Sequence, residues 1–246
     1  IILNDWQWYA DNHITLHTGF TVTDVDRVRR VVSATSKDGT VVTAEYDRLI
    51  LATGSNPFIL PIPGKDLPGV LAYRDIADTQ AMIDAAATYR HAVVIGGGLL
   101  GLEAANGLMK RGMQVTVVHV GPWLMERQLD EVAGKLLQQS LEQRGMQFLM
   151  GAQTEALLPA ASGRVGAVRF KAGTTPEPEV PADLVVMAVG IRPNTALAER
   201  MRLHVNRGIV VNDTMQTTTD PRIYAVGECA AHRGIAYGLV APLFEQ

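Results

Sequence analysis

The chain has 246 residues, of which 47% are hydrophobic and 19% are charged, and its formal net charge is −3 at pH 7. This composition is typical of a folded globular protein with room for one large domain or two ordinary ones. The weakly negative charge argues against nucleic acid or an anionic membrane surface as the main partner, because both favour a basic protein surface. Apolar runs stay below the roughly 18 residues that a membrane span needs, so no membrane partner is expected.

Cys229 is the only cysteine. An intramolecular disulfide, a Cys-x-x-Cys redox pair and an all-cysteine metal site are therefore excluded within the chain. We expect Cys229 to have a packing role. We expect no metal site in the chain, and a reducing compartment, the cytoplasm, as its location. The sequence starts at Ile1 without an initiator Met and ends at Gln246 without a clear terminal signal, so a segment of a longer protein is expected.

The first quarter of the sequence is predicted to be rich in strands. Asp38-Gly39 is a typical hairpin turn between two alternating segments. Four prolines within residues 55–69 predict an irregular connector, because proline cannot donate to a sheet ladder. The expected elements are a helix at 5–12, strands at 14–17, 29–35, 40–46 and 48–54, and a helix at 75–88.

The clearest unit spans residues 91–120. A short apolar strand at 91–95 runs into the turn Gly96-Gly97-Gly98-Leu99-Leu100-Gly101, a helix follows to Arg111, and a second strand occupies 114–119. This is a βαβ unit of ordinary length, about 30 residues. In that context Gly-x-Gly-x-x-Gly predicts a site for the pyrophosphate of a dinucleotide, held on the free N–H groups of the helix N-terminus. Gly96 permits the tight turn, Gly98 the close approach of the phosphates, and Gly101 the packing of the helix on the strand.

Two further residues of this region have more than one reading. The end of the second strand is where an acid binds the ribose of NAD or a basic residue suits the phosphate of NADP. His119 stands there and Arg127 follows eight residues later, so the choice stays open, with a lean to NADH; His119 also fits a plain strand end. Glu103, on the first turn of the helix, could orient the nicotinamide or a catalytic lysine, or could simply complement the helix dipole.

The rest of the sequence continues the alternation of strands and helices. Ala52-Thr53-Gly54 and Ala188-Val189-Gly190 end two apolar strands in similar turns, which suggests two related nucleotide-binding halves. A helix is expected at 129–144, and strands are expected at 146–150, 164–171, 182–189 and 223–226.

Four segments of the sequence resemble a known family: Gly96–Ala105, Leu124–Asp130, Tyr224–Ala230 and Tyr237–Pro242. They are similar to the large subunit of bacterial assimilatory NAD(P)H nitrite reductases and, more broadly, to the FAD-dependent pyridine nucleotide-disulfide oxidoreductases, such as rubredoxin reductases. The resemblance runs through almost the whole chain. It implies an α/β fold with two Rossmann-like (glutathione-reductase-like) domains, the NAD(P)H domain being inserted in an incomplete FAD domain.

The resemblance also implies domain limits and site residues. The FAD domain is expected at 1–76 and 196–246 and the NAD(P)H domain at 77–195, and the family's FAD-phosphate glycine turn is expected to precede residue 1. Glu103 is the candidate catalytic residue. The residues expected to bind NAD(P)H are Gly96, Gly97, Gly98, Leu99, Leu100, Gly101, His119, Arg127 and Gly190. Those expected to bind FAD are Val22, Ala52, Thr53, Gly54, Gly227, Glu228, Leu239, Val240, Ala241 and Pro242.

The implied function is transfer of hydride from NADH or NADPH to FAD and of electrons onward, to the iron–sulfur and sirohaem centre of a nitrite reductase. Those two centres are expected only outside this chain, in a downstream redox domain or subunit. Whether the protein forms a homodimer stays open. The alternatives are a rubredoxin- or ferredoxin-type NAD(P)H reductase and a dinucleotide-binding sensor without turnover.

Overall fold

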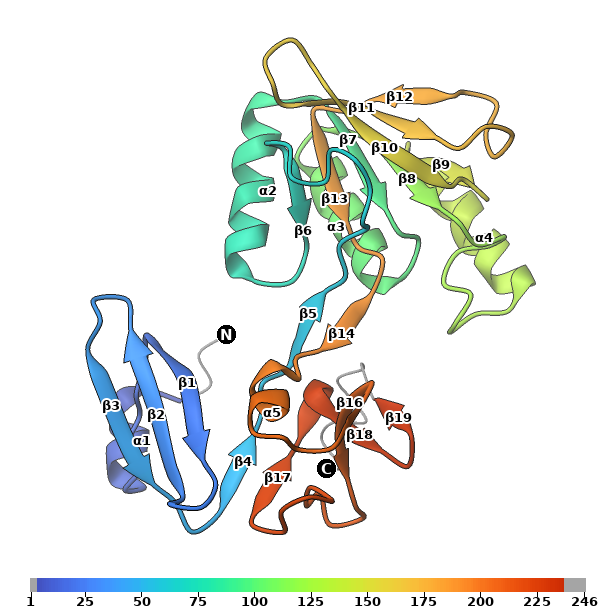
Figure 1. Cartoon of the computed structure of the whole chain (residues 1–246). Coiled ribbons are helices and arrows are strands. Elements are labelled where there is room, and N and C mark those ends of the chain that lie inside the picture. Colours follow the sequence, from blue (N-terminus) through green and yellow to red (C-terminus); the bar gives the residue numbers. More distant parts are fainter. Residues whose placement is uncertain (1–3, 237–246) are drawn as a thin grey trace. The chain divides into compact units, whose positions relative to one another are not determined.

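The computed structural model describes residues 4–236. The chain divides into two compact units: Ile1–Ser55 together with Pro193–Gln246 form an outer unit, and Asn56–Arg192 form a unit inserted in it. The short strands β5 (Ser55–Pro57) and β14 (Ile191–Pro193) pair where the chain passes between the units (Figure 1). The chain enters the inserted unit after Ser55, earlier than the limit expected after residue 76. The reason is that β6 (Val70–Ala72) pairs with β13 (Leu184–Met187) of the inserted unit.

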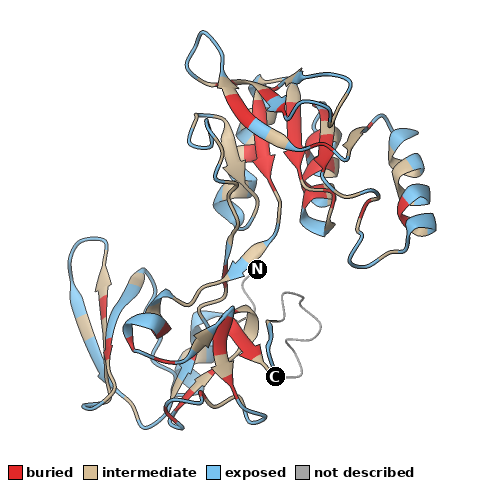
Figure 2. Ribbon diagram, turned by 45° about the vertical axis from the view of Figure 1, so that its right-hand side comes forward, coloured by how far each residue is buried: buried red, intermediate tan, exposed pale blue. Residues whose placement is uncertain are grey.

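The centre of the inserted unit is a parallel sheet of five strands in the order β6-β13-β7-β8-β9. Buried residues gather in these strands (Figure 2). Both faces are covered, which explains why the strands read as continuous apolar runs. The remaining strands of this sheet are β7 (His91–Ile95), β8 (Gln114–His119) and β9 (Gln147–Met150).

Alternate residues of each central strand belong to two different cores. Val94, with Val117, packs with residues of two helices, α2 (Ile76–Thr88) and α3 (Leu99–Lys110). Val93, its neighbour, packs on the other side with Val168 of a three-stranded antiparallel sheet. That second sheet consists of β10 (Thr154–Pro159), β11 (Val165–Phe170) and β12 (Glu179–Pro181).

Capping residues mark where the longer helices begin. Asp75 caps α2 and forms a reciprocal capping box with Asp78. Asp130 accepts the amide of Ala133 at 2.8 Å and caps α4 (Glu131–Glu142). Both helices therefore lie where the sequence predicts them, within two residues at each end.

The outer unit contains the antiparallel sheet β1-β2-β3. The strand predicted at 14–17 is wrong: those residues form no strand, and β1 (Phe20–Asp26) instead pairs with β2 (Val31–Ser36). Asp26 ends β1 because its Oδ1 accepts the amides of Val28 and Arg29 at 2.9 and 2.8 Å, which turns the chain back into β2. The third strand is β3 (Val41–Glu45).

In the remainder of the outer unit, strands from the segments before and after the inserted unit pair with each other. β4 (Leu49–Leu51) pairs in parallel with β17 (Ile223–Ala225), and both contribute to a core that also includes Val25. The other elements are α1 (Trp6–Asp11), α5 (Ala196–Arg200), β15 (Val205–Asn206), β16 (Gly208–Val211), the 3-10 turn η1 (Gly227–Cys229), β18 (Ala230–His232) and β19 (Ile235–Ala236).

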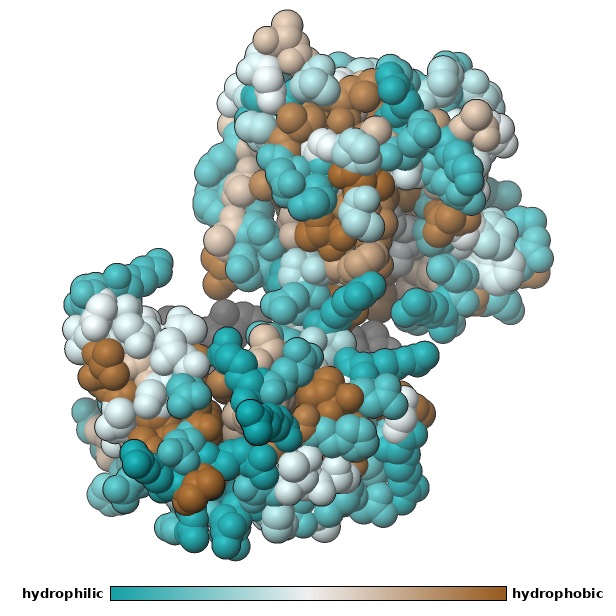
Figure 3. All heavy atoms as spheres, viewed as in Figure 1, coloured by the Kyte–Doolittle hydropathy of each residue, from teal (hydrophilic) through white to brown (hydrophobic). Residues whose placement is uncertain are grey.

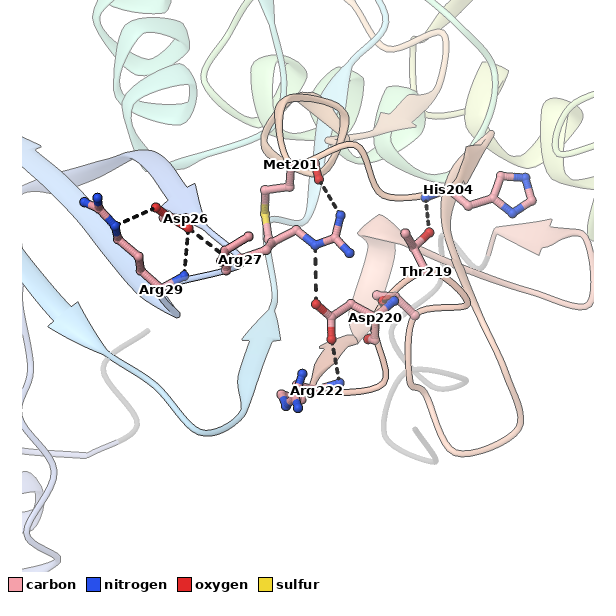
Figure 4. Close-up of polar contacts among 10 residues, drawn as sticks. Asp26, Arg27, Arg29, Met201, His204, Thr219, Asp220 and Arg222 are labelled. Atoms are coloured by element: carbon pink, nitrogen blue, oxygen red, sulfur yellow. Dashed lines mark hydrogen bonds and ion pairs between the residues drawn. The ribbon is translucent and has the colours of Figure 1, made fainter.

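The buried carboxylate of Asp220 connects the β1–β2 turn to the C-terminal part of the outer unit (Figure 4). Arg27 donates from Nε to Asp220 at 3.4 Å and from Nη1 to the carbonyl of Met201 at 3.1 Å. Asp220 also accepts the amide of Arg222 at 3.1 Å. Burial, and then the charge of Asp220, raise the pKa of Tyr46 above its usual value.

The surface is mixed in character. On the face drawn in Figure 3, hydrophobic side chains form patches that hydrophilic side chains border. Within residues 4–236, none of the helices has both the length and the apolar character to cross a membrane.

Candidate functional site

The glycine turn lies at the carboxyl edge of the parallel sheet, between β7 and α3. Gly96 has a φ of +123°, and its amide donates to the carbonyl of Val118 at 2.8 Å. A Cβ on Gly96 would come within 2.2 Å of the Ala188 carbonyl oxygen, and one on Gly101 within 1.9 Å of the Gly96 carbonyl oxygen. Only glycine allows this close contact between turn, helix and neighbouring strand, as the motif requires.

Gly98 differs from the other two glycines of the motif. It is the N-cap residue of α3 and has no side chain to cap the helix, and a Cβ built on it would meet nothing within 4 Å. The backbone is therefore open on that side, with the unsatisfied amides of the first helical turn next to it. Leu99 and Leu100 are also exposed, at 42% and 37%. An anion can approach this helix end closely.

His119 lies beneath the turn at the end of β8 and is 6% exposed. Its Nδ1 is 3.1 Å from the amide nitrogen of Gly97, and its Nε2 is 2.9 Å from Oε2 of Glu126. A backbone amide can only donate, so Nδ1 accepts and the ring proton is on Nε2, which donates to the carboxylate. This network assigns His119 as a neutral imidazole with both nitrogens engaged inside the protein.

The segment after β8 folds back over the turn. The amide of Met125 donates to the carbonyl of Gly97 at 3.0 Å, and the side chain of Leu124 is fully buried. Trp123 donates from Nε1 to the Leu129 carbonyl at 3.0 Å. Glu126 is thus held next to the turn although its side chain is 37% exposed. Arg127, which is expected at the site, is also exposed.

Glu103 and Gly190 lie at the margins of this arrangement. Glu103 is on α3 and its side chain is exposed. Gly190 has a φ of +113°, and its carbonyl accepts the amide of Phe58 at 2.9 Å. It follows β13, whose last residue, Met187, is paired with Ile95, the residue before the glycine turn.

Of the residues expected to bind FAD, those that the structure describes lie in the outer unit. Val22, Ala52 and Thr53 line one cavity of about 440 Å³ beside β1 and β4. Thr53 donates from Oγ1 to the carbonyl of Asn194 at 2.7 Å, and Gly54 accepts the Asn194 amide at 2.8 Å. The Ala-Thr-Gly turn is therefore fixed by Asn194, which follows the inserted unit.

The Gly227-Glu228 turn reaches the same part of the outer unit. Glu228 accepts a hydrogen bond from Ser55 Oγ at 2.9 Å. Gly227 has a φ of +77°. Cys229 is fully buried, with Sγ 3.4 Å from the Leu51 carbonyl oxygen. The other expected FAD residues, Leu239, Val240, Ala241 and Pro242, lie outside the described residues.

Two polar groups of the site were missed by the sequence analysis: Glu126 and Ser55. Glu126 belongs to the Leu124–Asp130 segment on which the family resemblance rests, but nothing in its spacing indicates a contact with His119. Ser55 is separated from Glu228 by 173 positions. Within the part of the chain that the structure describes, no cluster of three or more His, Cys, Asp or Glu could hold a metal ion.

Parallel strands ending at a glycine turn and a helix N-terminus define a dinucleotide-binding α/β protein. The chain matches the family described as pyridine nucleotide-disulphide oxidoreductase over residues 7–241. It belongs to that family, and the predicted family resemblance and α/β fold class are confirmed.

Several relatives are named for nitrite or nitrate metabolism. The chain is 59% identical over all of its residues to a nitrite reductase [NAD(P)H] of Bacillus subtilis (strain 168), and 49% identical to the assimilatory nitrate reductase electron transfer subunit of the same organism. It spans only 29% and 30% of the length of these two relatives.

Solved structures share the fold. A ferredoxin reductase from Rhodopseudomonas palustris matches with a TM-score of 0.85 and 29% identity, over 97% of this chain and 56% of that one. A putidaredoxin reductase in covalent complex with putidaredoxin matches with a TM-score of 0.82 and 33% identity, over 94% of this chain and 54% of that one.

Proposed function

We propose that this chain is the dinucleotide- and flavin-binding part of an oxidoreductase that passes hydride from NAD(P)H to FAD and electrons onward to a separate redox centre. One observation carries the proposal. A Cβ on Gly96 or Gly101 would collide with backbone atoms, at 1.9 Å in the closer case. Gly98, in contrast, faces open space at the N-terminus of α3, which has no side-chain cap. A turn that served only packing would not need this open glycine.

The geometry of the inserted unit fits NAD(P)H. The amides at the start of α3 would hold the pyrophosphate, and the exposed Leu99 and Leu100 would lie against it. Glu103, exposed on the same helix, is proposed to position the nicotinamide amide. Arg127 and Gly190 are proposed to border the site.

The geometry of the outer unit fits FAD. The cavity lined by Val22, Ala52 and Thr53 has room for part of a flavin nucleotide, about 440 Å³. Gly54 and Gly227 would let the backbone approach the cofactor closely, and the Glu228 carboxylate would accept a hydroxyl of the ribityl chain. Leu239–Pro242 are proposed to border the flavin ring.

The chemistry itself belongs to the cofactors: bound together, they supply hydride donation and one-electron release. The residues of this chain bind and orient. The helix N-terminus fixes the phosphates, and the buried contacts of the glycine turn hold the backbone in place before the dinucleotide arrives.

The acceptor we propose is the iron–sulfur and sirohaem centre of an assimilatory nitrite reductase, in a downstream domain or subunit. The relative with 59% identity that carries the name nitrite reductase supports this acceptor. A rubredoxin- or ferredoxin-type acceptor is the second candidate, supported by the structural match to a ferredoxin reductase. We further propose a cytoplasmic location; a homodimer is a further hypothesis.

Stopped-flow reduction of the FAD-loaded full-length protein by NADH and by NADPH tests this proposal. Loss of the oxidised flavin absorbance on mixing is the expected result. Flavin that stays oxidised although the nucleotide binds would instead support the sensor without turnover. A protein that binds neither flavin nor nucleotide would overturn the assignment. Supplying a rubredoxin or a nitrite reductase centre as acceptor then separates the two candidates.

A further inference from the structure

We propose that Glu126 is the residue that recognises the adenosine ribose and makes the site prefer NADH to NADPH. This inference rests on the proposed function, because it assigns a specificity residue within the same dinucleotide site. Such an acid ordinarily stands at the last residue of the second strand. Glu126 instead lies in the segment that follows β8.

The strand-end position itself is already used by the protein. His119 is 6% exposed, its Nδ1 accepts the Gly97 amide, and its Nε2 donates to Glu126. A protonated imidazole would turn an N–H of Nδ1 toward the N–H of Gly97, so the network favours the neutral ring. His119 therefore offers neither a positive charge for a ribose phosphate nor a free nitrogen for a ribose hydroxyl.

Glu126 carries the chemistry that His119 lacks. Its side chain is 37% exposed, against 7% for that of His119. One carboxylate oxygen accepts from His119 at 2.9 Å, and the carboxylate retains lone pairs for the hydroxyls of a ribose. The doubly charged 2′-phosphate of NADPH would face the same carboxylate and be repelled.

The position of Glu126 is fixed from both sides. His119 orients its carboxylate, and the preceding residue, Met125, donates its amide to the Gly97 carbonyl at 3.0 Å. Gly97 thus bonds to both supports of the acid and also belongs to the turn that would hold the pyrophosphate. The carboxylate is therefore kept at a constant distance from the phosphate site, as a specificity contact requires.

Arg127 is the competing group, because its positive charge could attract a 2′-phosphate. It is exposed, and no hydrogen bond or ion pair of the described residues fixes its guanidinium. An unfixed side chain gives up more conformational entropy on binding than one already held by the protein. The held carboxylate of Glu126 therefore outweighs the neighbouring Arg127.

The test is equilibrium binding of NADH and NADPH to the full chain, with the pair 5′-AMP and adenosine 2′,5′-bisphosphate as probes of the ribose alone. Glu126→Gln keeps the size of the side chain and removes the charge. We expect the preference for NADH over NADPH to fall by about tenfold, mainly through tighter NADPH binding. Glu142→Gln, an exposed acid at the end of α4, makes the same change of charge and should leave the ratio unaltered.

Arg127→Gln completes the set and should change the ratio less than Glu126→Gln does. If the wild-type protein binds both nucleotides and Glu126→Gln leaves their ratio unchanged, the inference fails while the proposed function stands. A wild-type preference for NADPH, or a larger effect at Arg127, would also overturn the inference. If the wild-type protein binds neither nucleotide, the inference and the proposed function both fail.

Discussion

Ser55 donates a hydrogen bond to Glu228 at 2.9 Å, although 173 positions separate the two residues. Ser55 is the last residue of the outer unit before the inserted unit, and Glu228 lies in the turn after β17. Because β4 and β17 are paired, the residues that follow each strand meet at the same edge. The bond therefore orients the carboxylate that we propose for FAD.

Replacing Glu228 with Ala is expected to weaken FAD binding by about tenfold, because one hydrogen bond to a charged group is lost. Recovery of flavin fluorescence on dilution measures the FAD dissociation constant. Ser55→Ala keeps the carboxylate and removes only its orienting donor, so its effect should be smaller. NADH binding should be unaltered in both variants. Unchanged FAD affinity in Glu228→Ala would remove Glu228 from the proposed site.

Substitutions at Gly98 and Gly101 should distinguish an effect on NADH binding from an effect on the stability of the fold. Gly98→Val places a side chain in open space, so we expect loss of NADH binding with a destabilisation of only about 1 kcal/mol, the difference between Gly and Val at an N-cap. Gly101→Ala puts a methyl group 1.9 Å from the Gly96 carbonyl oxygen, which should destabilise the fold by about 3 kcal/mol. Urea unfolding and NADH titration of both variants check this contrast. Tight NADH binding by Gly98→Val would count against the phosphate site.

The buried thiol of Cys229 is expected to pack rather than react. Its Sγ lies 3.4 Å from the Leu51 carbonyl oxygen and 3.3 Å from that of Val226, and the residue is fully buried. Cys229→Ser should lower the free energy of unfolding by about 1–2 kcal/mol, because a more polar group is buried. Flavin reduction by NADH should keep its wild-type rate. A rate that falls while the fold stays intact would indicate a redox role for the thiol.

The parts of the fold that the sequence predicted are those with local signals. The βαβ unit was recognised because each of its steps is marked within about 30 residues by an apolar run or a glycine. The caps Asp75 and Asp130 similarly mark α2 and α4. The glycine turn of the candidate site belongs to this local class.

The failures depend on partners distant in sequence or on loop geometry. Residues 14–17 alternate as a strand does, yet β2 pairs with 20–26, and only the turn at Asp26 decides between the two. The strand β10 was missed because Glu155 and Ala156 favour helix and Pro159 argues against a sheet. The His119–Glu126 contact depends on how seven residues fold back, which no periodicity encodes.

The contacts of Asp213 with the β18–β19 turn are expected to depend on pH in the acid range. Arg233 donates to both carboxylate oxygens of Asp213, and His232 is 2.7 Å from one of them. These bonds, Arg233 first, lower the pKa of Asp213 from 3.8 to about 2. A carboxyl group with a lowered pKa in the folded protein stabilises it fully above the ordinary value, and the contribution disappears as the pH falls toward the folded value. The contact between Asp213 and the β18–β19 turn should therefore persist at pH 4 and be lost toward about pH 2.

Carbon-13 NMR titration of the Asp213 carboxyl group measures this directly. In the wild-type protein the midpoint should lie near 2, as the lowered pKa requires. In Arg233→Gln it should move toward 3.8, because the larger of the two causes is removed, and in His232→Asn it should move less. A wild-type midpoint at 3.8 would mean that the hydrogen bonds from Arg233 and His232 to Asp213 are not formed in solution.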